Sequence, residues 1–542
     1  MQNKYFPLFV LFITSIIWFS LLGHRDLIDP DEARYAEIPR EMVASGDWIT
    51  PRLNDLKYFE KPVLQYWLTA VSFKLFGESN FSARLWLALS GYICALFIGF
   101  VGFRLYSKDA GYFAYLITIS SLLFAVLGHN LTLDMSLTLF MTLGVGSLAL
   151  AQNARAIPQQ NRNWMLLGWA SLAGAVLTKG LVAIVLPGAA AFFYMLWQRD
   201  WSLIKYLHLI KGLLLLFCLA SPWFFMVSDA NEEFFHFFFI REHFERFTTT
   251  EHRREGPIYY YIPILLLGVC PWLITSLSSL FKPQFSWRVT TSGHFDMDRF
   301  FWVYIVLVII FFSLSGSKLP SYILPVFPFI ALLAAKRITY SKIIKGDQWV
   351  LLVLSVVFFI IALFVEKFAS ELYPAELYAN YRPWIIVAAI FFGLASISIF
   401  KLKHNIKLGI TLASIFSLLS FQSLLGGFQE IGFTRSAVAE AAAISEQLPD
   451  TANVYALYSY PQALPFYLKR TITIVGYEGE LEMGIHSEPH KWIPSLDEFT
   501  IRWNQESQAA AIMRLEIYED LVNRNLSMTV ISRGTRWIVV KR

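Results

Sequence analysis

The sequence predicts a mainly α-helical, polytopic membrane protein with a small α/β domain at its C-terminal end. Of its 542 residues, 56% are hydrophobic and only 16% are charged, whereas soluble domains average about 25% charged residues. The apolar residues gather in runs long enough to cross a bilayer. The final part has no such run and contains short alternating stretches typical of strands. We therefore place a membrane domain at 1–425 and a soluble domain at 426–542.

About thirteen runs have the length of a membrane span. They cover 6–23, 84–103, 109–128, 132–151, 164–178, 181–198, 208–227, 257–281, 300–315, 320–335, 348–366, 383–400 and 408–425. Charged residues follow the first run where a small-residue cleavage site would stand, which indicates an uncleaved signal anchor. The two runs beside Lys179 are short and closely spaced, so they form either two spans or one re-entrant hairpin.

The positions of lysine and arginine predict the orientation of the spans, because short cytoplasmic loops are enriched in both. With the N-terminus inside, every predicted inner loop is basic. These loops hold Arg104, Lys108, Arg155, Arg162, Arg199, Lys205, Lys211, Lys282, Arg288, Arg299, Lys336, Arg337, Lys342, Lys345, Lys401, Lys403 and Lys407. An odd number of spans then places the C-terminal domain outside, with two polar outer segments at 24–83 and 228–256. Within the first, the amphipathic stretch 62–76 is expected to lie in the membrane interface.

Composition also excludes other classes of protein. The formal net charge of +5 is spread over the whole chain, and no basic patch is interleaved with aromatic residues, so nucleic acid is not an expected partner. The three cysteines, Cys94, Cys218 and Cys270, lie in or beside apolar runs without metal-site or disulfide spacing. We expect them to be small buried residues.

Ionisable residues of the first outer segment are the first candidates for chemistry. Asp31 follows the first span within Asp29-Pro30-Asp31-Glu32, where it suits either a helix N-cap or a catalytic carboxylate. In Tyr58-Phe59-Glu60-Lys61-Pro62, Lys61 and Tyr58 are placed either to grip a phosphate at the level of the lipid headgroups or to anchor the segment in the interface. Glu60 is able to neutralise Lys61 or to hold a metal ion.

Further candidates lie at the outer ends of later spans. Asp134 is near membrane depth, where a carboxylate is costly unless it is paired or hydrated, and it is either a helix cap or a functional residue. Lys179 and Lys318 also stand at span ends. Snorkelling explains each lysine alone, whereas several cations on one face favour an anionic, lipid-linked ligand.

The second outer segment carries histidines beside arginines. His243 and Arg246 are one helical turn apart, and His252 lies nearby. One of these histidines, with Glu60, would supply two ligands to a divalent cation. The alternative is a histidine that is hydrogen-bonded in a polar loop.

Together and in this order, these strings resemble the bacterial lipid A aminoarabinose transferases, GT-C-type membrane glycosyltransferases that are distantly similar to protein O-mannosyltransferases. The strings are Asp29-Pro30-Asp31-Glu32-Ala33-Arg34-Tyr35-Ala36-Glu37, Ser45-Gly46-Asp47-Trp48, Tyr58-Phe59-Glu60-Lys61-Pro62, Thr178-Lys179-Gly180, Glu242-His243 with Arg246-Phe247, and Lys318-Leu319-Pro320 with Tyr322. The resemblance covers the membrane part and is weaker in the C-terminal domain.

The resemblance implies transfer of 4-amino-4-deoxy-L-arabinose from undecaprenyl phosphate to a lipid A phosphate, at the periplasmic face of the bacterial inner membrane and among membrane lipids. It implies paired catalytic carboxylates at Asp31 and Asp134, with Glu32 as a third candidate. The substrate-binding residues that it implies are Arg34, Tyr35, Tyr58, Lys61, Lys179, Arg246, Lys318 and Tyr322. It also implies a divalent ion, zinc or similar, held by Glu60 and His243, with His252 as the alternative histidine.

Physical chemistry agrees with these roles. A lipid phosphate is a good leaving group and needs cations more than it needs an acid. The attacking phosphate oxygen is ionised at neutral pH, so the site acts mainly by positioning and electrostatics, and Asp31 is expected to orient a substrate group. A transferase for another sugar or acceptor remains an alternative. A flippase for a polyprenyl lipid is another, but it would be expected to have polar groups near the bilayer midplane and an inverted repeat.

Overall fold

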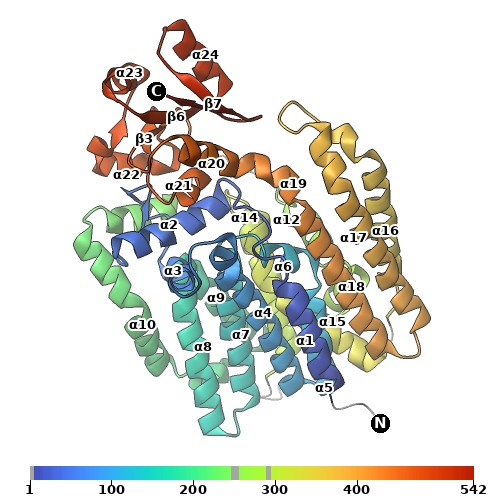
Figure 1. The fold of residues 1–542 in the computed structure, drawn as a ribbon. Coiled ribbons are helices and arrows are strands. Elements are labelled where there is room, and N and C mark those ends of the chain that lie inside the picture. The colour runs from blue at the N-terminus through green and yellow to red at the C-terminus, as the bar shows by residue number, and fades with distance from the viewer. Residues whose placement is uncertain (1–4, 246–255, 288–294, 343) are drawn as a thin grey trace.

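A layer of long helices forms the body of the protein, and a sheet-containing domain covers one end of it (Figure 1). The structure is a computed structural model that describes residues 5–245, 256–287, 295–342 and 344–542. In the described part, 8 helical segments are long and apolar enough to cross a membrane. They are α4 (Asn80–Leu105), α7 (Asp134–Asn153), α10 (Leu209–Ala230), α14 (Met297–Leu314), η3 (Pro320–Val326) with α15 (Phe327–Ser341), α16 (Asp347–Phe364), α17 (Ala375–Lys401) and α18 (Ile406–Gly427).

Three more predicted spans are single helices. They are α1 (Phe6–Phe19), α8 (Pro158–Lys179) and α9 (Val182–Gln198). The helices α8 and α9 are separate and meet at Gly180, where φ is +85°. This positive φ suits glycine, which has no Cβ, and it lets the chain leave α8 directly after Lys179. The region beside Lys179 is therefore a pair of helices.

Two predicted spans are each broken into two helices, which corrects the expectation of continuous helices there. The run 109–128 forms α5 (Lys108–Ile119) and α6 (Leu122–Leu127), and 257–281 forms α12 (Tyr261–Gly268) and α13 (Leu273–Phe281). The breaks contact each other: the Leu122 amide donates to the Cys270 carbonyl at 2.8 Å, and the Trp272 indole donates to the Ser120 hydroxyl at 2.9 Å. Pro271 lacks an amide hydrogen and interrupts the second run. The first of these bonds gives two backbone groups at the breaks a partner within the protein, as membrane burial requires.

Short elements cross the end of the bundle that faces the sheet domain. They are α2 (Asp31–Ser45), β1 (Arg52–Leu53), β2 (Leu56–Lys57) and α3 (Leu64–Phe76). In Figure 1, α2 runs roughly across the long helices, and α3 is seen end-on beside it. One side of α3 is buried, while Leu75 and Phe76 at its end are exposed.

The C-terminal domain is built on a 6-stranded sheet in the order β5-β4-β3-β6-β8-β7. The first four of these strands are parallel, and β8 and β7 add antiparallel pairs. The strands are β3 (Asn453–Leu457), β4 (Thr473–Val475), β5 (Trp492–Ile493), β6 (Ala509–Met513), β7 (Thr529–Arg533) and β8 (Ile538–Lys541). The helices are α19 (Gln429–Gly432), α20 (Val438–Gln447), α21 (Ala463–Leu468), α22 (Glu482–Ser487), α23 (Leu496–Gln505) and α24 (Leu515–Asn523).

Side chains alternate across this sheet, as expected for strands that are covered on both faces. On one face, Tyr455 and Leu457 pack with Phe499 and Trp503 of α23. On the other, Val454 joins the same apolar core as the membrane helices. The sheet domain is thus fused to the bundle through its core, while the predicted boundary at 425/426 lies within α18.

One cysteine differs from the expectation of burial. Cys94 and Cys270 are buried, but Cys218 is exposed on α10. The same helix exposes large apolar side chains such as Leu214 and Phe217. An exposed apolar face is typical of a helix surrounded by lipid. The small apolar side chain of Cys218 is part of that face.

Candidate active site

A cavity of about 220 Å³ lies at the end of the bundle nearest the C-terminal domain. Five segments line it: the start of α2, the loop after β2, the α6–α7 loop, the end of α8 and the loop that leads into η3. The lining residues are Asp31, Arg34, Tyr35, Glu60, Lys61, Leu127, Asn130, Thr132, Leu133, Asp134, Lys179, Leu319, Pro320, Ser321 and Tyr322. Three cations and three carboxylates are among these lining residues.

Asp31 and Arg34 stand one turn apart at the start of α2. The Arg34 guanidinium donates to the Asp31 carboxylate at 2.5 Å, and the Asp31 side chain is 51% exposed. The helix begins at Asp31 itself, Pro30 occupies the N-cap, and no side-chain bond caps the helix. Asp31 is therefore not an N-cap, and its carboxylate is presented to the cavity.

Arg34 is surrounded by two aromatic rings of the same outer segment and by one carboxylate from the C-terminal domain. Its guanidinium lies 5.7 Å from the ring centre of Tyr35 and 5.8 Å from that of Tyr58. Glu480 approaches it at 4.0 Å. Burial raises the pKa of Tyr35 and of Tyr58, so both phenols stay neutral. These contacts fix Arg34 as a cation against the cavity wall.

Glu60 and Lys61 form a second charged wall. The Lys61 ammonium donates to the Glu60 carbonyl at 2.7 Å and lies 4.0 Å from the Glu60 carboxylate. The backbone just before them is held by the Tyr58 amide, which donates to the Pro51 carbonyl at 2.9 Å. Both side chains are partly exposed and line the cavity.

Asp134 and Lys179 face Tyr322 on the remaining side. Asp134 is the first residue of α7, is buried, and forms a short ion pair with Lys179. The Lys179 ammonium lies 4.4 Å from the Tyr322 ring centre. Lys179 is thus held by a carboxylate and by the face of an aromatic ring. Snorkelling of its ammonium group toward water does not explain these two contacts.

Three described residues of the predicted set do not line the cavity: Tyr58, Lys318 and Glu32. Tyr58 is buried behind Arg34. Lys318 is buried, and its ammonium donates to the Ser315 carbonyl at 2.6 Å. Glu32 receives two bonds from the Arg84 guanidinium, at 2.7 and 2.8 Å, and one from the Leu131 amide at 2.9 Å. Although burial opposes the charged form, Arg84 and Arg25 hold the pKa of Glu32 below its usual range. The Glu32 carboxylate therefore ties α2 to α4 and to the α6–α7 loop, and its catalytic role stays a prediction.

Some residues of this site were not singled out from the sequence. Thr132 and Asn130 line the cavity, and the Thr132 hydroxyl and Arg34 Nε are buried without a partner among the described residues. Buried polar groups usually have a partner, so these two groups indicate that a polar ligand enters here. Glu480 was missed because it belongs to a domain for which the sequence offered no site motif.

Part of the predicted metal site lies outside the described residues. Arg246 and His252 fall there, and so does the side chain of His243, although its backbone belongs to the π-helix η2 (His236–Glu245). In the described part of the chain, no group of three or more potential metal ligands is found. Glu60 alone is too few ligands for a zinc site, so no chemical step is assigned to a metal here.

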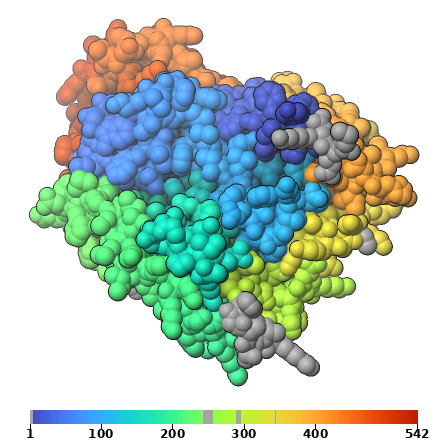
Figure 2. Space-filling model, turned by 90° about the horizontal axis from the view of Figure 1, so that it is seen from below, coloured from blue at the N-terminus to red at the C-terminus, as the bar shows by residue number. Residues whose placement is uncertain are grey.

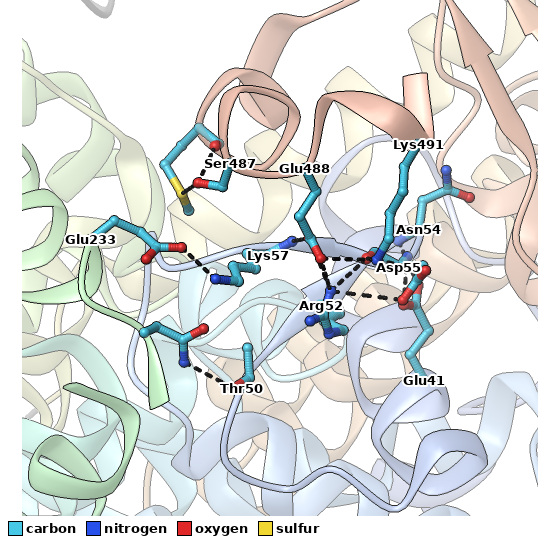
Figure 3. A network of polar contacts seen from close by, with 12 residues as sticks. Glu41, Thr50, Arg52, Asn54, Asp55, Lys57, Glu233, Ser487, Glu488 and Lys491 are labelled. Atoms are coloured by element: carbon cyan, nitrogen blue, oxygen red, sulfur yellow. Dashed lines mark hydrogen bonds and ion pairs between the residues drawn. The ribbon is translucent and has the colours of Figure 1, made fainter. Parts of the chain in front are cut away.

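A polar network fixes the hairpin that precedes Glu60 and Lys61 (Figure 3). Arg52 pairs with Glu488 of the C-terminal domain at 3.0 Å, and Lys57 pairs with Glu233, which follows α10, at 2.6 Å. The Glu41 carboxylate accepts the backbone amide of Asp55 at 2.8 Å. The hairpin is therefore held by the C-terminal domain, by α2 and by the segment after α10.

Comparisons with known proteins define first the class of protein. Residues 4–235 match the family model described as dolichyl-phosphate-mannose-protein mannosyltransferase, and residues 440–542 match the aminoarabinose transferase C-terminal domain. The Archaeoglobus fulgidus oligosaccharyltransferase has a similar fold, with a TM-score of 0.52 at 12% identity. The fold and the charged cavity are those of a GT-C membrane glycosyltransferase.

Whole-chain relatives define the family within this class. Undecaprenyl phosphate-alpha-4-amino-4-deoxy-L-arabinose arabinosyl transferase from Shewanella sediminis (strain HAW-EB3) is 31% identical over 511 residues, which cover 90% of this chain and 89% of the relative. The counterpart from Enterobacter sp. (strain 638) is 32% identical over 67% of this chain and 66% of its own length. The crystal structure of ArnT from Cupriavidus metallidurans bound to undecaprenyl phosphate has a TM-score of 0.92 and 32% identity, covering 99% and 98% of the two chains. This chain belongs to the aminoarabinose arabinosyl transferase family.

Proposed function

We propose that this protein transfers 4-amino-4-deoxy-L-arabinose from undecaprenyl phosphate to a phosphate of lipid A, at the periplasmic face of the bacterial inner membrane. The observation that carries this proposal is the cavity of cations and carboxylates in a chain of this family. A lipid-linked sugar phosphate and a lipid phosphate acceptor are both anionic, and Arg34, Lys61 and Lys179 are placed to receive them.

An apolar groove beside the cavity suits the polyprenyl tail of the donor. The groove has a volume of about 580 Å³ and lies between α9 and α14. Its lining includes Val185 and Leu314, which are close in the chain to the cavity residues Lys179 and Leu319. A donor whose phosphate sits in the cavity would lay its isoprenoid chain along this groove, where apolar contact stabilises it.

In the reaction, a phosphate oxygen of lipid A attacks the anomeric carbon of the sugar. The new carbon–oxygen bond forms as the bond from that carbon to the undecaprenyl phosphate oxygen breaks, and the bonding electrons leave with the lipid phosphate. Negative charge grows on the leaving phosphate, where Lys61 and Arg34 would stabilise it. The attacking oxygen is already ionised, so no proton needs to be removed.

Two of the three carboxylates of the cavity, Asp31 and Asp134, are proposed to position other groups and not to accept a proton. Asp31 holds Arg34 and has an exposed oxygen, which can receive the sugar amine or face positive charge at the anomeric carbon. Asp134 holds Lys179 against Tyr322, and Lys179 then faces one of the two phosphates. Arg246 is proposed as a further ligand of the donor phosphate.

We also propose that a divalent ion, zinc or a similar metal, is bound by Glu60 with His243, or with His252 in its place. The support for this is the partly exposed Glu60 carboxylate at the cavity wall. When bound, such an ion would add positive charge beside the donor phosphate.

The function is tested by expressing the chain in a bacterium that makes the lipid-linked sugar but lacks its own aminoarabinose transferase. Mass spectrometry of lipid A is expected to show the added aminoarabinose only when the chain is present. Unmodified lipid A, with the protein in the membrane and the donor lipid accumulated, would contradict the proposal. A different added sugar mass would instead indicate a relative that uses another donor.

A further inference from the structure

A second pocket, of about 290 Å³, lies far from the active-site cavity, between the α15–α16 loop and the α17–α18 loop. The opposite end of the α16–α17 hairpin touches the C-terminal domain, where Arg536 donates to the Tyr373 hydroxyl at 3.3 Å. The helix α16 has 18 residues and is thus about 27 Å long. The pocket therefore lies at the end of the hairpin away from the active site, at the edge of the face in Figure 2 where yellow and orange segments meet.

Three lysines from the two loops surround this pocket. They are Lys342, Lys345 and Lys403, and in the described part of the chain none has an ion-pair partner. The nearest carboxylate in the sequence, Asp347, accepts the backbone amides of Ile274 and Thr275 in α13 at 2.9 and 3.2 Å. All three side chains are exposed, and three like charges around one hollow attract an anion to it.

Apart from Gln348, the rest of the pocket wall is apolar, and it lies at the ends of the spanning helices α16 and α17. Ile399, Phe400 and Ile406 contribute to it. The Phe400 ring meets the exposed Trp349 ring edge-on at 5.0 Å. Tryptophan is enriched where membrane meets water, and α16 and α17 both begin or end at this level. Charge beside apolar surface at the headgroup level suits a lipid better than a soluble anion.

We propose that this pocket binds the phosphate headgroup of an anionic phospholipid, whose acyl chains pack along the ends of α16 and α17. The three lysine ammonium groups would contact the phosphate, as in other basic pockets between membrane helices. A zwitterionic lipid carries the same phosphate, but its own cation would meet the lysines and weaken binding. The pocket lies away from the donor and acceptor cavity, so it is a site for a structural lipid of the surrounding leaflet.

The proposal is tested by native mass spectrometry of the purified full-length protein, titrated with dioleoylphosphatidylglycerol or with dioleoylphosphatidylcholine. The wild type is expected to bind the anionic lipid at least about tenfold more tightly. Each lysine near an anionic surface contributes roughly fivefold, so Lys342→Gln, Lys345→Gln and Lys403→Gln combined should lower that affinity roughly a hundredfold and leave the affinity for the zwitterionic lipid unchanged. Each single variant should lose about fivefold, which keeps the test valid if the triple variant does not fold.

The matched control removes three other exposed lysines that do not line the pocket, with Lys108→Gln, Lys205→Gln and Lys211→Gln. This control is expected to keep the wild-type affinity and lipid preference. Equal losses in both triple variants would mean a general charge effect and would overturn the site. A titration with sn-glycerol 3-phosphate forms the last arm: binding as tight as that of the lipid would assign the pocket to a soluble phosphate and overturn the lipid proposal.

Discussion

At the scale of single residues, Asp31 and Glu32 have the same charge but opposite surroundings. Successive residues of an α-helix point about 100° apart, so Asp31 faces the cavity while Glu32 faces Arg84. The sequence contains both carboxylates next to each other and holds no local signal that separates them. The position of α4 makes the difference between the two surroundings, because Arg84 of α4 lies within ion-pair distance of the Glu32 carboxylate.

Exchanging Asp31→Asn or Lys61→Ala is expected to abolish transfer of the sugar to lipid A. Lys61→Ala loses a charged contact to an ionised phosphate, which costs about 1.5–3 kcal/mol or more than tenfold in rate. Asp31→Asn loses the charge that holds Arg34 and orients the sugar. The measurement is sugar-modified lipid A by mass, in cells with equal amounts of each variant in the membrane. The control is Lys74→Ala, an exposed lysine of the same outer segment that does not line the cavity. Full modification by both active-site variants would falsify the proposed site.

The pair of Asp134 and Lys179 is expected to act as one unit. Asp134→Asn and Lys179→Ala should each lower the transfer rate at least about tenfold, because each removes the partner that positions the other. The double variant should lose little more than either single one, since residues that share one interaction are not additive. The measurement is the initial rate with purified enzyme and both lipid substrates. Independent, multiplying losses would contradict a shared role.

The metal proposal is tested by elemental analysis of the purified protein. Glu60→Ala and His243→Ala are each expected to lower the bound zinc or similar ion, because each removes one ligand of a small set. His252→Ala is the matched variant and should retain the metal. Loss of metal in His252→Ala alone would move the assignment to that histidine. Purified wild type without bound metal, after preparation free of chelators, would contradict the proposal.

At the scale of elements, buried ion pairs and backbone bonds lock the short outer elements onto the long helices. Glu32 ties α2 to α4, and the Arg52–Glu488 pair ties the hairpin before Glu60 to the C-terminal domain. A backbone bond from the Leu122 amide to the Cys270 carbonyl joins the broken helices α5–α6 and α12–α13. Several elements therefore fix the geometry of the cavity, and no single element holds all of its residues.

Glu32→Gln is expected to destabilise the protein by about 3–5 kcal/mol, because it leaves the buried Arg84 charge without its partner. The pKa of Glu32 is lower in the folded than in the unfolded chain. Its contribution is thus present above the unfolded-state pKa and is lost as pH falls through the folded-state pKa. Unfolding in detergent, followed by circular dichroism, measures the change. The control Glu366→Gln breaks an exposed pair with Arg382 and should change stability by less than about 1 kcal/mol.

At the scale of the whole molecule, the sequence predicted the helical membrane domain and the α/β domain because hydrophobic runs and strand-like alternation are local signals. The helix breaks at Ser120 and Pro271 were not predicted, although Pro271 is a visible signal, because the surrounding runs are apolar throughout. The approach of Glu480 to Arg34 joins residues that are far apart in the chain. Such pairings depend on how the C-terminal sheet docks, which no local pattern encodes.

At the same scale, the basic residues predict the orientation of the whole molecule in the membrane. The described ends of α4, α15 and α17 away from the C-terminal domain carry Arg104, Arg337 and Lys401, and basic residues favour the cytoplasmic side. The cavity and the C-terminal domain would then face the periplasm. A reporter enzyme that is active only in the periplasm, fused after Arg542, is therefore expected to be active. The same reporter fused within the α17–α18 loop, after Lys403, should be inactive. An active reporter at Lys403 and an inactive one at Arg542 would invert the orientation and move the proposed transfer to the cytoplasmic face.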